Sequence, residues 1–443
     1  MNSYEERKVN VVEACAKTNG SFRVHKGSSS NLFRYGPRQQ QANNTISLAE
    51  FKHVLNLDAE AETVDTEGLV TYEQLVAYTL ERGFLPTVSP ELKHITVAGA
   101  VVGIGIESTC FRHGFVHDGL LEADVLLSDG RVVTCSPDNE HSDLFYGLPN
   151  SYGTLGYILR AKIRLIPAKP YVRIENSRHH SIDEYLTALS QAVEDPINDF
   201  VEGLFYSPTE QYMTRSFFAD EAPAVKDIYR ENIYYKLLRQ DASFYLPTFD
   251  YIFRYDPDWF WNVPEGGIYD LLRRHGPMAL RNSGFYARYR LFINGFERLL
   301  GRDRSSGQEP LIQDWQVPWD RAGDFMQFIA DHVDIQDQPW VAGPIVTPRT
   351  PTNYPIRANT LYLNVGCYCS ARKPRDEIDY YYTRILDQKC FELGGIKMLY
   401  SSSFLEQDEF DSYYNGAIYS TLKEKYDPDG RAPTLYEKAV QNR

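Results

Sequence analysis

The spacing of apolar and polar residues in the first part of the chain predicts both helices and strands. Residues 71–82 have the spacing of an amphipathic helix, and Thr71 followed by glutamate and glutamine is typical of a helix N-terminus. Residues 119–135 predict two strands joined by a turn at Asp129-Gly130. A helix is also predicted at 5–17, and strands are predicted within 21–27, 45–70 and 151–167.

The pattern changes after residue 170, where helices alternate with strands. The segment from Ala219 to Gln308 is rich in aromatic residues, interrupted by prolines and predicted to be mainly helical. Tyrosine combines an apolar ring with a polar tip, so these residues suit either a core or a wide apolar pocket. Helices are also predicted at 181–195, 374–393, 406–425 and 433–441, and strands at 200–207, 361–369 and 396–400.

The most informative stretch runs from Ile95 to Gly114. Four glycines interrupt it, and each would cost a packed helix about 1 kcal/mol relative to alanine. Glycine also allows the backbone to approach a ligand closely, so we expect a loop that lies against a phosphate-bearing cofactor. The order Gly103-x-Gly105-x-x-Ser108 lacks the third glycine and the following helix of a dinucleotide-binding fingerprint, which argues against a Rossmann site.

Composition and charge exclude several classes of protein. Hydrophobic residues make up 43% of the 443 positions, which is enough for a large folded core. The net charge of −14 and the lack of a basic cluster argue against nucleic-acid binding. No apolar run approaches the roughly 20 residues of a membrane span, and the N-terminus lacks a signal peptide. Six scattered cysteines favour a reducing compartment over a disulfide framework, and their spacing suggests no metal site.

A second candidate loop is the serine run at 28–30, whose hydroxyls and backbone amides could hold a diphosphate. The ordered set of this run, the glycine-rich stretch and 151–167 resembles the vanillyl-alcohol-oxidase/PCMH-type FAD-binding fold. Collinear segments at 85–108, 142–172, 200–207, 361–368, 394–426 and 433–439 are similar, more closely, to the Δ24-sterol reductase (seladin/diminuto) family.

This resemblance implies an α+β fold. It consists of a two-subdomain PCMH-type FAD-binding domain at 1–170, an α/β cap (substrate) domain at 171–393 with an antiparallel sheet and flanking helices, and a C-terminal segment at 394–443 that returns to the flavin site. The chain shows no hydrophobic N-terminal anchor like that of the eukaryotic sterol enzymes and starts at the first helix, so a soluble, cytoplasmic relative is expected.

The resemblance also implies FAD as cofactor. Positions 27–30 contain no histidine that could carry flavin covalently, so non-covalent binding is expected. The cofactor-binding residues that it implies are Lys26, Gly27, Ser28, Ser29, Ser30, Asn31, Thr96, Gly99, Gly103, Gly105, Ile106, Ser108, Thr109, His113, Gly114, Gly153, Gly156 and Ile158.

The implied reaction is reduction of a carbon–carbon double bond, with NADPH or NADH as electron donor and a positioned acid as proton source. Candidate catalytic residues are Tyr400, Lys397 and Glu107, since a carboxylate in a cofactor loop is costly unless it is used. Strand alternation puts Tyr362 and Asn364 on one face, and with Ser402 they are candidates for substrate contact. Each also has a structural alternative: the tyrosines could simply pack, and Lys397 could be solvated.

The aromatic middle of the chain suits a lipid-like substrate such as a sterol, isoprenoid or acyl chain. Residues 286–300 could dock on a membrane surface as a peripheral contact, or could form an ordinary amphipathic helix. Two other functions remain open. The same fold hosts FAD-dependent alcohol or sugar oxidases and dehydrogenases that use oxygen or a quinone, and it could also bind FAD without catalysis.

Overall fold

The computed structural model describes residues 3–18, 20, 22–27, 44–230, 233–257, 275–277, 281–285, 308–335, 338–374 and 377–441. The serine run with Asn31, the segment at 286–300 and most of the aromatic region between 258 and 307 lie outside these residues.

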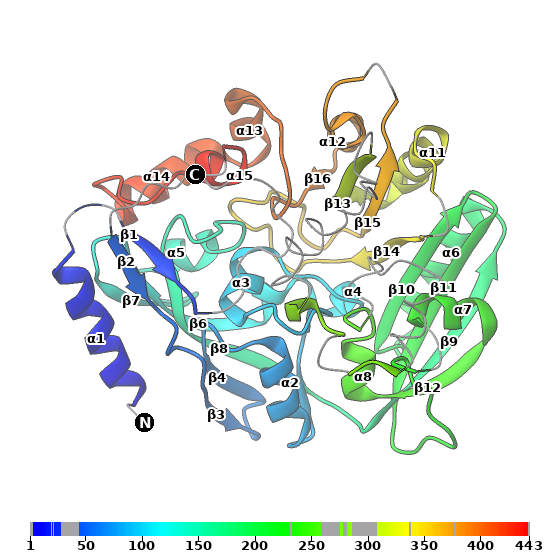
Figure 1. Cartoon of the computed structure of the whole chain (residues 1–443), viewed down its shortest axis with the longest axis horizontal. Coiled ribbons are helices and arrows are strands. Elements are labelled where there is room, and N and C mark those ends of the chain that lie inside the picture. The colour runs from blue at the N-terminus through cyan, green and yellow to red at the C-terminus, as the bar shows by residue number, and fades with distance from the viewer. Residues whose placement is uncertain are drawn as a thin grey trace.

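The first half of the chain builds an antiparallel sheet in the order β3-β4-β8-β6-β7, with β5 paired to β8 (Figure 1). The predicted hairpin is confirmed, since β6 and β7 pair on either side of Asp129-Gly130. A parallel pair, β1 and β2, lies beside this sheet. The bounds are α1 Tyr4–Ala16, β1 Phe22–His25, β2 Asn44–Ser47, β3 Val54–Asp58, β4 Thr63–Glu67, α2 Tyr72–Leu80, β5 Phe84–Pro86, α3 Val97–Val102, α4 Cys110–His113, η1 Val116–Gly119, β6 Leu120–Leu126, β7 Val132–Cys135, α5 Ser142–Gly147 and β8 Tyr157–Pro167.

The second half builds an antiparallel sheet of eight strands in the order β12-β9-β11-β10-β14-β15-β13-β16. The helices α6, α11 and α12 flank it, as the α+β prediction with an antiparallel cap sheet requires (Figure 1). The bounds are β9 Tyr171–His179, α6 Ile182–Glu194, β10 Phe200–Ser207, β11 Glu210–Ala219, α7 Tyr234–Gln240, β12 Ser243–Pro247, α8 Thr248–Ile252, β13 Gln308–Pro318, η3 Trp319–Arg321, α11 Ala322–His332, β14 Trp340–Ile345, β15 Tyr362–Arg372, α12 Tyr381–Glu392 and β16 Ile396–Lys397.

The chain ends in α13 Gln407–Tyr413, α14 Gly416–Tyr426 and α15 Leu435–Ala439. Although distant in sequence, α14 packs against α5 of the first half (Figure 1). The Tyr419 hydroxyl donates to the Thr154 hydroxyl at 2.9 Å, and the Lys423 ammonium donates to the Thr154 carbonyl at 2.8 Å. The C-terminal segment therefore contacts the turn before β8. The three domain boundaries themselves stay a prediction.

Five predicted elements differ from the structure. The glycine-rich stretch is not loop throughout, because Thr96 caps α3 and buried Val97, Ala100 and Val101 hold its turns. The helix predicted at 406–425 is two helices, since the backbone at Asn415 is left-handed (φ 53°). The predicted helix at 374–393 begins only at Tyr381, and the strand at 396–400 has two residues. In the predicted helical segment from Ala219 to Gln308, the described part contains the strand β12.

Two apolar clusters divide between the faces of the eight-stranded sheet. On the outer face, Leu363, Val365 and Cys367 of β15 pack with residues of α6, α11 and α12. On the inner face, Tyr362 and Tyr368 of the same strand pack in the cluster that includes the glycine-rich stretch. All six cysteines are free thiols. None of the helices in the described residues is long and apolar enough to cross a membrane.

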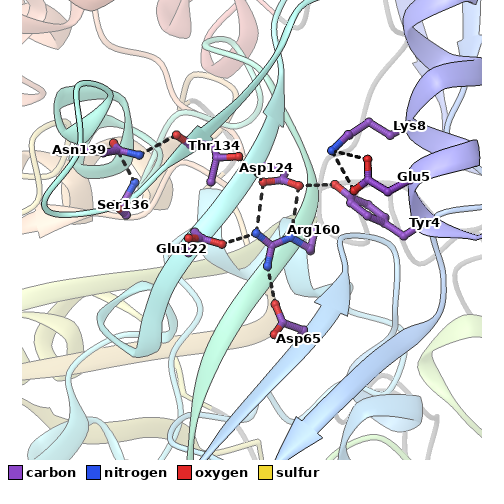
Figure 2. Close-up of polar contacts among 10 residues, drawn as sticks. All are labelled: Tyr4, Glu5, Lys8, Asp65, Glu122, Asp124, Thr134, Ser136, Asn139 and Arg160. Carbon is purple, nitrogen blue, oxygen red and sulfur yellow. Dashed lines mark hydrogen bonds and ion pairs between the residues drawn. The ribbon is translucent and has the colours of Figure 1, made fainter. Parts of the chain in front are cut away.

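A partly buried charge cluster joins three strands of the first sheet and the N-terminal helix (Figure 2). The Arg160 guanidinium on β8 bonds to Asp65 on β4 and to Glu122 and Asp124 on β6. The Tyr4 hydroxyl of α1 donates to Asp124 at 2.6 Å. Burial acts to raise the pKa of Asp124, but hydrogen bonds from Arg160, Tyr4 and Thr134 hold it below its ordinary value.

Replacing Arg160 with methionine should therefore destabilise the fold by about 2–4 kcal/mol, because three neighbouring carboxylates lose their common cation. The control Arg131→Met removes an exposed pair with Asp129 and should cost less than about 1 kcal/mol. The pKa of Asp124 is lower in the folded protein than in the unfolded chain. The stability that this carboxylate contributes is therefore present above about pH 4 and is lost as the pH falls further. Urea unfolding between pH 3 and pH 7 measures both effects. Equal losses for the two variants would contradict this account.

Candidate functional site

The turn that follows α3 is held in a conformation that is rare for its residues. Ile104 is β-branched and buried, yet its φ is 58°, a strained value that persists only where the surroundings impose it. At Gly105, a Cβ atom would lie 2.7 Å from Val116 Cγ2, so only glycine fits there. The turn is thus fixed by close packing, which is typical of backbone that is pre-organised for a ligand.

A second strained turn lies directly beside it. The Tyr152 N–H donates to the Val102 carbonyl at 3.2 Å, and the Tyr152 hydroxyl donates to the Gly103 carbonyl at 3.4 Å. Positive φ values recur at Asn150, Tyr152, Gly153 and Gly156 in this turn. The structure therefore brings together two of the three segments that the sequence linked to one cofactor.

Several buried polar atoms near these turns lack a hydrogen-bond partner among the described residues. They include Ser108 Oγ, Ser151 Oγ and Asn150 Oδ1. An unsatisfied buried polar group costs about 1–3 kcal/mol, so such a group needs a separate explanation. A polar ligand such as FAD, with many donors and acceptors, fits this arrangement of groups.

The inner face of the eight-stranded sheet carries polar side chains opposite these turns. Asp314 on β13 is buried and accepts hydrogen bonds from Tyr400 at 2.6 Å, Asn364 at 2.8 Å and Tyr368 at 3.1 Å. Gln316 extends this network by donating to Asn364 and accepting from Tyr354. The candidate residues Tyr400 and Asn364 are therefore members of one hydrogen-bonded group.

Burial controls the ionisation of this group. It raises the pKa of Asp314 even though Tyr400, Asn364 and Tyr368 donate hydrogen bonds to the carboxylate. Burial, with the charge of Asp314 as the next cause, raises the pKa of Tyr400 well above its ordinary value. Tyr400 is consequently a protonated phenol at neutral pH with a fixed hydrogen-bond direction.

A buried arginine connects the glycine-rich turn to the sheet. Arg254 donates to Glu107 at 2.7 Å and to Glu202 on β10 at 2.5 Å, and its side chain is fully buried. Burial acts to raise the pKa of Glu107, but the charge of Arg254 and hydrogen bonds from neighbouring groups lower it overall. The Ser108 N–H also donates to Glu107 at 2.7 Å, so this carboxylate fixes the local backbone.

Glu91 lies next to Glu107, and its pKa shifts in the opposite direction. Burial and the negative charge of Glu107 raise its pKa well above the ordinary value. The charge on Glu91 also contributes to raising the pKa values of Tyr255 and Tyr368.

The structure places Lys397, another catalytic candidate, on the outer side of the sheet. It is buried, not solvated, and its ammonium pairs with Asp387 of α12 at 2.6 Å and donates to the Ser402 carbonyl at 2.8 Å. The Tyr362 hydroxyl accepts hydrogen bonds from Arg357 at 3.3 Å. These contacts are structural. Among the described residues, Lys397, Ser402 and Tyr362 make no hydrogen bond to the Asp314 group.

The remaining candidates occupy different places around the turns. Gly27 lies two residues after β1 and has a φ of 72°. The Thr109 hydroxyl donates to the Thr87 carbonyl at 2.8 Å. The Thr96 hydroxyl accepts from the Gly99 N–H, and His113 is partly buried beside Gly114. Ile158 is buried on β8, and its carbonyl lies 2.1 Å from where a Cβ at Gly68 would be. Ser28, Ser29, Ser30 and Asn31 lie outside the described residues.

Sequence reasoning did not find Asp314, Tyr368, Glu91, Glu202 or Arg254. Two of them carried a usable signal: Glu202 interrupts the apolar strand at 200–207, and Arg254 lies within a run of aromatic residues. A buried charge is costly unless it is paired, so such positions indicate a partner elsewhere in the chain.

The carboxyls Glu91 and Glu107 should respond differently to replacement by glutamine. Glu107→Gln removes the charge that Arg254 needs and should cost about 1.5–3 kcal/mol at pH 7. Glu91→Gln should be neutral or stabilising, because a carboxyl whose pKa is raised on folding loses stability as the pH rises above about 4.5. Urea unfolding at pH 5 and pH 7 tests this. A larger loss for Glu91→Gln than for Glu107→Gln would refute the assignment.

Comparison with known proteins agrees with this geometry. Residues 4–136 match the FAD binding domain family. The chain is 27% identical to the Delta(24)-sterol reductase of Homo sapiens over 87% of this chain and 75% of that protein. It is also 27% identical to that of Arabidopsis thaliana over 90% and 77%, and 36% identical to cytokinin dehydrogenase 7 of Oryza sativa subsp. japonica over 35% and 31%. The chain therefore carries an FAD binding domain, and it is similar over most of its length to the Delta(24)-sterol reductases, which supports an FAD-dependent oxidoreductase.

Proposed function

We propose that the protein is an FAD-dependent reductase of a carbon–carbon double bond in a lipid, with NADPH or NADH as electron donor. The observation that carries this proposal is the Tyr400 phenol, bonded at 2.6 Å to buried Asp314 on the sheet face that meets the glycine-rich turn. The similarity to Delta(24)-sterol reductases over most of the chain supports a sterol, isoprenoid or acyl chain as the substrate class.

The residues around the two turns would hold the cofactor non-covalently. The proposed contacts are those implied by the sequence, from Lys26 to Asn31, Thr96 to Gly114 and Gly153 to Ile158, together with Ser151. Bound FAD, once reduced, supplies the hydride for one alkene carbon. The protein's own task is to exclude water, orient the lipid and deliver a proton to the other carbon.

Tyr400 is the proposed proton donor in this reaction. Its raised pKa keeps the phenol protonated, and its hydrogen bond to Asp314 holds the phenol oxygen in place. To reach the alkene carbon, the O–H bond would rotate away from Asp314 before the proton is transferred. Asp314 is a positioning residue, since it acts through Tyr400. Asn364 and Tyr368 complete the shell of donors that stabilises the buried carboxyl. Lys397 and Ser402 are better explained as supports of the segment that carries Tyr400.

A cellular location can be proposed from the expected substrate. The match to sterol reductases supports a lipid substrate, and lipids partition into membranes, so we propose a cytoplasmic protein with peripheral membrane contact.

A second candidate function follows from the cytokinin dehydrogenase match. That relative is 36% identical over 163 residues, although this covers only 35% of the chain. An FAD-dependent dehydrogenase or oxidase would take electrons from its substrate and pass them to oxygen or a quinone. The direction of electron flow separates the two functions.

The decisive experiment follows the absorbance of the purified flavoprotein without oxygen. NADPH or NADH should bleach the flavin absorbance, and a lipid with an isolated double bond should restore it and yield the saturated product. Sterol, isoprenoid and acyl alkenes should be compared. Failure of both nicotinamides to bleach the flavin, with hydrogen peroxide formed from an alcohol or amine in air, would favour the second function.

Replacing Tyr400 with phenylalanine should slow reoxidation by the alkene by about 100-fold or more, because the proton donor is lost. Bleaching by the nicotinamide should stay unchanged, since that step does not use the phenol. The control Tyr413→Phe alters a partly buried tyrosine that stacks on Phe391, and it should leave both rates unchanged. Stopped-flow measurement of the two half-reactions separates them. Equal slowing of both by Tyr400→Phe would instead indicate a structural role.

A further inference from the structure

A cavity of about 310 Å³ opens beside the glycine-rich stretch, between the two halves of the molecule. Its walls come from α4, from β8 and from the loop after β14, and they include Arg112, His113, Arg164 and Asn359. Small-molecule sites begin at about 300 Å³, so the cavity has room for a compact polar group. Neither the proposed catalytic group around Tyr400 nor the Arg254 cluster lines it.

Two arginines give the cavity a positive character in a protein whose net charge is −14. Arg164 is exposed, and its guanidinium has no ion-pair or hydrogen-bond partner among the residues that the structure describes. Arg112 donates to the Pro196 carbonyl at 3.1 Å and lies 4.0 Å from Asp199, a weak pairing. At least one guanidinium is therefore available to a ligand.

The other polar residues of the cavity are compatible with an anion. Burial, then the charges of Arg112 and Arg164, lowers the pKa of His113 to about 4, so at neutral pH its ring is an uncharged donor and acceptor. Asp118 is the acidic residue in the wall. One of its oxygens accepts from the Phe115 N–H at 2.8 Å and from the Thr347 hydroxyl at 3.0 Å, and Arg349 lies 3.9 Å from the other oxygen.

We propose that this cavity binds the phosphate group of a small ligand, with Arg112 and Arg164 as its charged contacts. Guanidinium groups suit phosphate because their planar N–H donors match its oxygens in paired hydrogen bonds. Asn359 would supply a neutral hydrogen bond, and His113, which is also a proposed FAD contact, would lie at the border between the cofactor and this cavity. A phosphate site here is distinct from the alkene chemistry and does not depend on it.

The same phosphate chemistry could come from free phosphate, a nucleotide or a lipid headgroup. The test titrates the FAD-loaded protein by calorimetry with inorganic phosphate, with NADP⁺ beside NAD⁺, and with phosphatidylcholine vesicles with and without phosphatidic acid. The probe that binds most tightly identifies the source. Binding should weaken as salt increases, because the contacts are ionic.

Arg164→Gln should weaken binding of that probe roughly tenfold or more, and adding Arg112→Gln should abolish it. Both side chains are exposed, so the variants should fold, and thermal unfolding checks this. The matched control Arg321→Gln changes a half-exposed arginine outside the cavity and should leave binding unchanged. The proposal is overturned if no probe binds, or if the affinity is the same in the double variant. Loss of alkene reduction with intact phosphate binding would count against the proposed function alone.

Discussion

The buried guanidinium of Arg254 is the interaction on which the arrangement of the two sheets depends. It lies between Glu202, on a central strand of the eight-stranded sheet, and Glu107, at the end of the glycine-rich turn. An unpaired charge in this position would cost several kcal/mol, so both carboxylates must be in place when the halves meet. Because Glu107 also accepts from the Ser108 N–H, the same ion pair fixes the backbone of the turn.

This constraint explains why the eight-stranded sheet has two different faces. The outer face packs against helices mainly through apolar residues such as Leu363, Val365 and Cys367 of β15, and the buried Lys397–Asp387 ion pair also lies on this side. The inner face carries Glu202, Asp314 and Asn364, which are stable there only because each has hydrogen-bonded partners. The hydrogen bonds around Asp314 hold the Tyr400 phenol in a fixed position on the face that meets the strained turns. The protein's own side chains can therefore orient this proton donor without help from water.

The sequence predicted those parts of the structure that depend on neighbouring residues. The cap at Thr71 is present, with Gln74 bonding back to it, and the turn at Asp129-Gly130 joins two paired strands. The break at Asn415 had a signal that was missed: both flanking segments have helical spacing, but Asn415-Gly416 between them is a typical turn dipeptide, and Asn415 is left-handed.

The hydrogen-bond partners within the candidate site are far apart in the sequence, so local patterns could not predict them. Arg254 is 147 residues from Glu107, and Tyr400 is 86 residues from Asp314. Which carboxylate meets which cation is decided by the pairing order of the strands, and spacing along the chain does not encode it. The family resemblance compensated in part, because it indicated the segments that converge, although it did not indicate the buried acidic partners.

The segment after β16 shows how finely position decides role. Lys397 is in register with Trp315, whose indole N–H donates to Asp387, and its ammonium reaches the same carboxylate on the outer side of the sheet. The next ladder bond, from the Met398 N–H to the Asp314 carbonyl, ends the pairing, and two residues later Tyr400 reaches the Asp314 carboxylate. Only two residues, Met398 and Leu399, thus separate the lysine of a structural ion pair from a candidate acid. The residue type alone suggested both as catalytic, and only the side of the sheet distinguishes them.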